Sequence, residues 1–71
     1  MKEIIIKDDF IRLDSALKFG GISQTGGQAK ITIQSGLVSV NGEICTMRGK
    51  KLYNGDKIKF EGYEYIIKNE G

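Results

Sequence analysis

The stretch Thr25–Gly42 reads T-G-G-Q-A-K-I-T-I-Q-S-G-L-V-S-V-N-G and predicts a helix followed by a tight β-hairpin. Thr25 and Gln28 have the T-x-x-Q spacing of a capping box, in which both side chains accept hydrogen bonds from amides at a helix start. Gly36 suits the end of this helix, because glycine readily adopts the left-handed conformation that follows a last helical turn. One helical face carries small side chains that a second helix can approach closely: Ala29, Thr32, Ile33 and Gly36.

The second half of this stretch predicts the hairpin. Val38 and Val40 alternate with a serine, which is the pattern of a strand with one buried face. Asn41-Gly42 follows, and this dipeptide is the strongest short signal for a hairpin turn because it tolerates the positive φ angles that the turn requires. We therefore expect residues 43–46 to return antiparallel to the strand that contains Val38.

The segment before this stretch predicts a strand and then a helix. Residues 2–7 hold three consecutive isoleucines between charged residues, which favours a short N-terminal strand. Asp8 or Asp9 is expected to cap a helix that runs through Phe19 and stops at a glycine pair.

The first helix is expected to have one face on the core. Phe10, Leu13 and Leu17 fall on one side of it, which is the spacing of residues that pack inward. Arg12 lies on the opposite side. Phe19 shares the stripe of Arg12, and we expect it to pack on a neighbouring element; the alternative is an exposed ring beside Arg12.

The segment after the hairpin predicts a basic loop and two further strands. Residues 47–52 form the loop, which returns to the core at Leu52. Asn54-Gly55-Asp56 marks a turn. Residues 57–60 and 63–68 alternate as strands do, with a tight turn between them. The expected fold class is α+β, with two early helices packed on a small, mostly antiparallel sheet that ends in hairpins.

The composition limits the classes of protein that this chain can represent. Its 71 residues, 39% of them hydrophobic, suit a single domain over residues 1–71. The single cysteine, Cys45, excludes an internal disulfide, and the absence of histidine excludes the usual zinc sites and histidine-activated nucleophiles. No apolar run is long enough to span a bilayer or to form a signal peptide. We expect a monomer in the cytoplasm that does not engage membranes.

An enzymatic function is not expected. Each aspartate has a local explanation as a cap, a helix-surface charge or a turn residue, and without histidine a general base near neutral pH would need a strongly perturbed carboxylate or lysine. Cys45 falls in a predicted strand, where a small buried thiol is far more common than a nucleophile. No catalytic residue, cofactor or metal site is predicted.

Positive charge is concentrated in the middle of the chain. The net charge is only +2, but residues 30–60 hold six basic and two acidic side chains. Lys30, Arg48, Lys50 and Lys51 could together neutralise several phosphates of a polyanion. An ordinary solvated surface is the alternative interpretation of this charge pattern.

The glycine pair Gly26-Gly27 falls in the first turn of the second helix. Unshielded amides and the helix dipole favour an anion there, so a phosphate contact with Gly26, Gly27 and Gln28 is physically reasonable. The equally weighted alternative is that these glycines only shape a tight approach to the helix.

Spaced elements in this order resemble the S4 RNA-binding domain family. They are Arg12-Leu13-Asp14-x-x-Leu17, then Ala29-Lys30-x-x-Ile33-x-x-Gly36-x-Val38-x-Val40-Asn41-Gly42, then Gly55-Asp56-x-Ile58. The resemblance covers residues 12–60 and is closest to small, stand-alone bacterial members. It implies an αL-type helix pair with a following hairpin, and structured RNA, ribosomal or transfer-like, as the partner.

The resemblance also implies where RNA would bind: along the second helix, at its N-terminus and at the base of the hairpin. Combined with the glycine pair, the candidate RNA-binding residues are Arg12, Thr25, Gly26, Gly27, Gln28, Lys30, Arg48, Lys50 and Lys51. Asp14 is expected to act structurally, as an ion-pair or capping partner. Many family members have arginine after the Ser or Thr that starts the second helix, whereas this chain has Gly26, which should weaken or alter the contact there.

Two other functions are weighed against RNA binding. The segments V-N-G-E-I and L-Y-N-G-D-K-I-K-F resemble the end of β-grasp sulfur carriers, but those need a Gly-Gly C-terminus and this chain ends Asn69-Glu70-Gly71. The second is an adaptor that binds proteins of the ribosome or of another assembly. The leading hypothesis remains RNA binding, with the ribosome or its precursors as the cellular target and ribosome maturation as the process.

Overall fold

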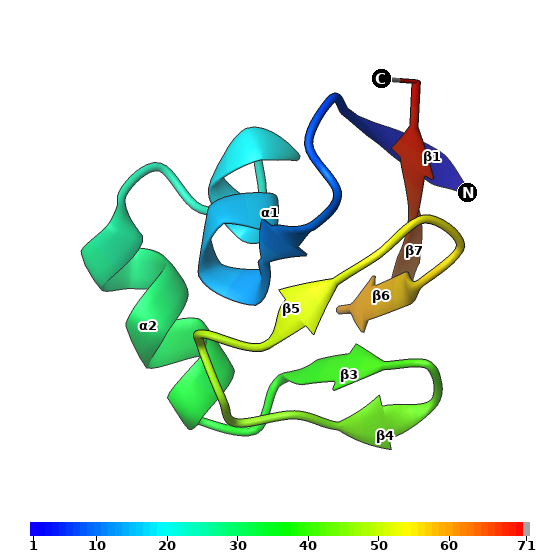
Figure 1. The fold of residues 1–71 in the computed structure, drawn as a ribbon. Helices are drawn as coiled ribbons and strands as arrows, with labels where there is room; N and C mark the ends of the chain where they lie inside the picture. The colour runs from blue at the N-terminus through cyan, green and yellow to red at the C-terminus, as the bar shows by residue number, and fades with distance from the viewer. Residues whose placement is uncertain (71) are drawn as a thin grey trace.

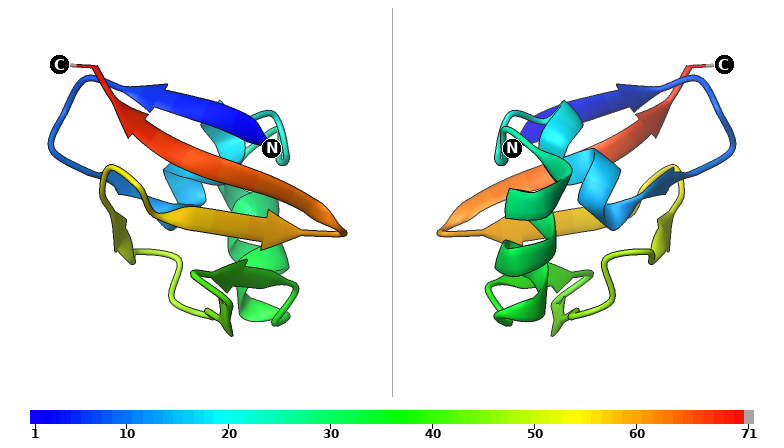
Figure 2. Two further views of the ribbon diagram at one scale, coloured as in Figure 1. Left: turned by 90° about the vertical axis from the view of Figure 1, so that its right-hand side faces the viewer. Right: turned by 90° about the vertical axis from the view of Figure 1, so that its left-hand side faces the viewer.

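A five-stranded sheet and a pair of helices form the two main layers of the structure, a computed structural model in which residues 1–70 are described (Figure 1). In chain order the elements are β1 (Lys2–Ile6), β2 (Ile11–Arg12), α1 (Leu13–Phe19), α2 (Gly26–Gln34), β3 (Val38–Val40), β4 (Glu43–Ile44), β5 (Lys51–Leu52), β6 (Lys57–Phe60) and β7 (Tyr63–Asn69). Both helices cover the same face of the sheet, as the two views of Figure 2 show. The predicted α+β class is confirmed.

The sheet has the strand order β1-β7-β6-β3-β4 and is antiparallel except for one pair. That pair joins the two ends of the chain, because β1 lies parallel to β7 with Ile4 beside Ile67. The strands β2 and β5 lie apart from this sheet as an antiparallel ribbon of two residues each. This ribbon is the element that the sequence analysis did not anticipate.

The second helix forms as predicted. The Thr25 hydroxyl accepts a hydrogen bond from the Gln28 amide at 3.1 Å, and the Gln28 side chain accepts one from the Gln24 amide at 2.9 Å. The capping box is therefore reciprocal, although Gln28 reaches one residue further back than the standard motif. The helix ends at Gln34, and Gly36 has a φ of +77° in the left-handed region.

The hairpin also forms as predicted. Asn41 and Gly42 have φ angles of 52° and 88°, which is the conformation of a two-residue primed turn. The returning strand β4 is shorter than expected, but the Cys45 amide continues the pairing with the Val38 carbonyl at 2.9 Å. The Asn41 side chain donates to Asp56 at 3.1 Å and accepts from the Lys57 amide at 2.9 Å, so this turn is fixed to the start of β6.

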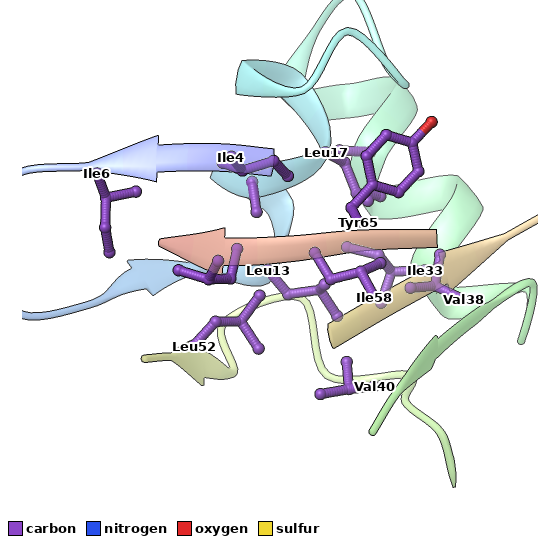
Figure 3. Packing of buried hydrophobic residues seen from close by; sticks show 13 residues of the cluster. Ile4, Ile6, Leu13, Leu17, Ile33, Val38, Val40, Leu52, Ile58 and Tyr65 are labelled. Atoms are coloured by element: carbon purple, nitrogen blue, oxygen red, sulfur yellow. The ribbon is translucent and has the colours of Figure 1, made fainter. Parts of the chain in front are cut away.

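The core lies between the helices and the sheet. Figure 3 shows the side chains of Leu13 and Leu17 from α1 and Ile33 from α2 near Ile58 and Tyr65 of the sheet. The buried apolar residues are Ile4, Ile6, Leu13, Ala16, Leu17, Ala29, Ile33, Val38, Val40, Leu52, Ile58, Tyr65 and Ile67. Each large side chain that becomes fully buried stabilises the fold by about 1.5–3 kcal/mol. The predicted return of the chain to the core at Leu52 is confirmed.

The prediction for the first helix was wrong at its start. The helix begins at Leu13, so Asp8 and Asp9 do not cap it, and no side chain caps it in their place. The Leu13 amide instead donates to the Lys50 carbonyl at 2.8 Å, and the Asp14 amide donates to the Arg48 carbonyl at 3.0 Å. A segment more than thirty residues away therefore replaces the local cap, which the sequence of this helix does not encode.

Two aromatic residues therefore lie in other environments than predicted. Phe10 precedes the β2–β5 ribbon and is 38% exposed, so it does not belong to the buried face of a helix as expected. Phe19, at the last position of α1, is 67% exposed, and the expectation that it packs on a neighbouring element was also wrong.

Candidate nucleic-acid interface

The basic loop is attached to the first turn of α1 through its backbone. Its carbonyls accept the two helix-start hydrogen bonds described above, and the Lys50 amide closes a turn on the Met47 carbonyl at 3.1 Å. Pairing of β2 with β5 then places Arg12 opposite Lys51. The Arg48 and Lys50 carbonyls and the Lys50 amide are hydrogen-bonded within the protein, while the side chains of Arg48, Lys50 and Lys51 are exposed to solvent. The loop therefore presents its cations from a fixed position.

Arg12 joins this loop from the neighbouring strand. A Cβ atom at Gly49 would lie 3.6 Å from Arg12 Nη2, so the guanidinium group lies against the loop backbone. Its Nη2 also donates to Asp14 Oδ2 at 3.1 Å. The structural role expected for Asp14 as an ion-pair partner is confirmed. We call Arg12, Arg48, Lys50 and Lys51 the basic cluster.

The remaining candidates lie at the start of α2. We call them the helix-start group: Thr25, Gly26, Gly27, Gln28 and Lys30. All five are exposed, whereas Ala29 and Ile33 of the same helix are buried in the core. Within residues 1–70, the Gly26 and Gly27 amides have no hydrogen-bond acceptor, as expected for the first two residues of a helix whose cap bonds the third. These amides and the positive end of the helix dipole can hold an anion.

The two glycines are not required by packing. A Cβ atom at Gly26 would meet nothing within 4 Å, and one at Gly27 would meet only Thr25 Oγ1 at 3.8 Å. Neither residue has a positive φ. One interpretation of this pair was that the glycines allow the chain to approach the helix tightly. The space around both residues gives that interpretation no steric basis.

The two groups of candidates form separate clusters. In Figure 1 the start of α2 lies at the left edge of the molecule, whereas the chain between β4 and β5, which holds the basic loop, passes in front of the second half of this helix. Figure 2 shows the same separation along α2. A ligand that contacts both groups must extend along α2.

The sequence analysis did not identify two exposed aromatic residues beside the basic cluster. Phe10 and Tyr53 continue β2 and β5 by one residue, and their ring centroids lie 6.0 Å apart. The triplets F-I-R and K-L-Y carried a signal, because each has one apolar residue between two residues that prefer the surface or an interface. Both triplets are too short to be recognised as strands without the structure.

Other kinds of site find no support in the part of the chain that the structure describes. Residues 1–70 contain no group of three histidine, cysteine or acidic side chains that could hold a metal ion. Among the described residues, neither helix is long and apolar enough to cross a membrane.

The fold and the clustered cations define a small α+β domain suited to binding a polyanion. The sequence pattern of the S4 domain matches residues 4–68. The chain therefore belongs to the S4 domain family. RlbA of Bacillus subtilis (strain 168), which is named as a probable ribosome maturation protein, is 40% identical over 60 residues, or 84% of each chain.

A second relative has a solved structure. YbcJ of Escherichia coli (strain K12), named as an RNA-binding protein, is 37% identical over 61 residues, which is 86% of this chain and 87% of YbcJ. The solution structure of E. coli YbcJ superimposes with a TM-score of 0.73 and 32% identity over 96% of this chain and 87% of that one. It is described as revealing an αL motif involved in RNA binding, so the predicted αL-type helix pair is confirmed.

The glycine pair leads to a prediction about stability. Gly26→Ala and Gly27→Ala should each raise the free energy of unfolding, by up to about 1 kcal/mol, because alanine favours the helix and its methyl group has room. Urea denaturation measures this change. Gly36→Ala is the control and should lower stability, because its φ of +77° disfavours any side chain. A loss of stability at position 26 or 27 would show that these glycines shape the helix start.

Proposed function

We propose that this protein binds structured RNA and holds it without catalysing a reaction. The observation that carries the proposal is the basic cluster, in which Arg12 of β2 lies beside three cations of a loop whose backbone is hydrogen-bonded to α1 and β2. Lysine and arginine side chains on a fixed frame suit a charged backbone, and lysines read base edges less well than phosphates. The described function of YbcJ, a relative with the same fold, supports the same class of ligand.

The helix-start group would form the second contact. Its free amides and Lys30 would bind a phosphate at the end of α2 away from the basic cluster. Two separate contacts can be made at once only by an RNA that holds its phosphates at the matching distance. A single patch would not select for that distance. This arrangement favours structured RNA over a flexible single strand.

The finer proposal concerns the target and the setting. The name of RlbA supports ribosomal RNA or a ribosome precursor as the target and ribosome maturation as the process. The protein would then act in the cytoplasm, as a monomer.

Charge reversal in the basic cluster tests the proposal. Lys50→Glu with Lys51→Glu should weaken binding of a hairpin RNA and lower the slope of log K against log salt by about 2, one unit for each lost phosphate contact. Fluorescence anisotropy over a series of salt concentrations measures both quantities. Binding should fall alike for hairpins of different sequence.

Lys57→Glu with Lys59→Glu is the matched control. It makes the same charge change at two exposed lysines of β6, which flank the buried Ile58 and therefore lie on the face of the sheet opposite the core. Equal losses in both variants would mean that only net charge matters, and unchanged binding in the first would mean that the proposed surface is wrong. If the unmodified protein binds no naked RNA, the adaptor hypothesis takes precedence.

The glycine at position 26 gives a gain-of-function test. Gly26→Arg restores the arginine common in the family, and the open space around Gly26 accommodates it. We expect tighter RNA binding and a salt slope larger by about 1. Gln34→Arg adds the same charge at the exposed opposite end of α2 and should give no comparable gain. Equal effects of the two substitutions would contradict a phosphate contact at the helix start.

A further inference from the structure

The outer face of the β2–β5 ribbon combines aromatic and basic side chains. Ile11 pairs with Leu52, and Leu52 is fully buried, so this pair faces the core. Successive side chains of a strand point to opposite faces, so the residues on either side of this pair point outward. These four residues are Phe10, Arg12, Lys51 and Tyr53. We call this face the ribbon platform.

The two rings of the ribbon platform contact each other and a cation. Their centroids are 6.0 Å apart with an interplanar angle of 49°, and Lys51 Nζ lies 4.9 Å from the centre of the Phe10 ring. Phe10 nevertheless remains 38% exposed and Tyr53 50% exposed. Each ring therefore keeps a large apolar surface in water that no described part of the chain covers.

The platform is held in place by backbone contacts. The Tyr53 amide donates to Asp56 Oδ2 at 2.7 Å, and the Asp56 amide donates back to the Tyr53 carbonyl at 3.0 Å. Asp56 also contacts Asn41, which ties this turn to the hairpin. Rings on such a support lose little conformational entropy when a ligand stacks on them.

There is open space next to the platform. Phe10 lines a largely apolar hollow of about 270 Å³ together with Ile5, Ile11 and Phe19, and the charged residues Lys7 and Asp8 also line it. Asp14 is engaged by Arg12, and Asp56 by Asn41 and the Tyr53 amide. Arg12 and Lys51 belong to the platform itself, so it offers apolar rings with positive charge beside them.

We propose that the ribbon platform binds an unpaired nucleotide of the RNA, with the base stacked on Phe10 and Tyr53 and its phosphates near Arg12 and Lys51. This inference rests on the proposed function and specifies which part of the RNA the protein recognises. Bases within an A-form helix are stacked on each other, so only an unpaired base can present its face to an aromatic ring. Base–aromatic stacking next to cations is a general means of binding unpaired nucleotides.

The test compares two RNA probes that share one stem. The first is a hairpin with 2-aminopurine in its unpaired loop, and the second is the same stem as a blunt duplex. Phe10→Leu with Tyr53→Leu keeps apolar cover over the ribbon but removes the aromatic faces. It should weaken hairpin binding by about fivefold or more, abolish the quenching of 2-aminopurine, and leave duplex binding unchanged.

Two further variants separate stacking from a structural effect. Tyr63→Leu is the control, because it makes the same change at a 62% exposed tyrosine on β7, outside the ribbon, and should leave both probes bound as before. Phe10→Trp keeps an aromatic face and should retain hairpin binding and quenching. Tyr53→Leu alone provides the test if the double variant does not fold.

The outcomes distinguish this inference from the proposed function. Equal loss of hairpin and duplex binding in the aromatic variant, or no loss for either, overturns the inference. If charge reversal at Lys50 and Lys51 still weakens both probes in that case, RNA binding stands and only the platform is wrong. If the unmodified protein binds neither probe, both proposals fail and a protein ligand for the exposed rings is favoured.

Discussion

The structure depends on two backbone hydrogen bonds at the start of α1. The amides of Leu13 and Asp14 donate to the carbonyls of Lys50 and Arg48, at 2.8 and 3.0 Å. Unsatisfied amides at a buried helix start are costly, and most helices satisfy them with a side chain from the preceding residue. Here a distant loop satisfies them. The same contact completes the helix, joins the ends of β2 and β5 and fixes the backbone that carries the basic cluster.

These two hydrogen bonds explain how a chain of 71 residues with little net charge can present a local basic surface. The net charge is only +2, so long-range attraction to a polyanion is weak, and local placement of charge has to provide most of the binding. The loop places its carbonyls inward on α1 and its long side chains outward. At the start of α2 the backbone amides, and not long side chains, face the solvent, because two glycines follow the cap residue Thr25. In the proposed function, the two clusters would bind the same kind of ligand with different parts of the peptide, side chains in one and backbone amides in the other.

Local signals in the sequence predicted the parts of the fold that are locally determined. The capping box of Thr25 and Gln28, the stop at Gly36 and the Asn41-Gly42 turn all act over a few residues, and all three are confirmed. The start of α1 and the exposure of Phe10 depend instead on pairing between residues forty positions apart, and no local pattern reports it. The resemblance to the S4 family gave the helix pair and the class of ligand. It did not show that the candidate residues form two separate clusters, because that requires coordinates.

A two-dimensional NMR titration of the ¹⁵N-labelled protein with a hairpin RNA tests the central claim most directly. The account predicts that the amide signals of Arg12 and residues 47–53 shift together with those of residues 25–30, while signals from the paired strands β1 and β7 stay in place. Shifts confined to the sheet, or to only one of the two clusters, would contradict a surface with two separate phosphate contacts. The absence of any shift would contradict RNA binding itself.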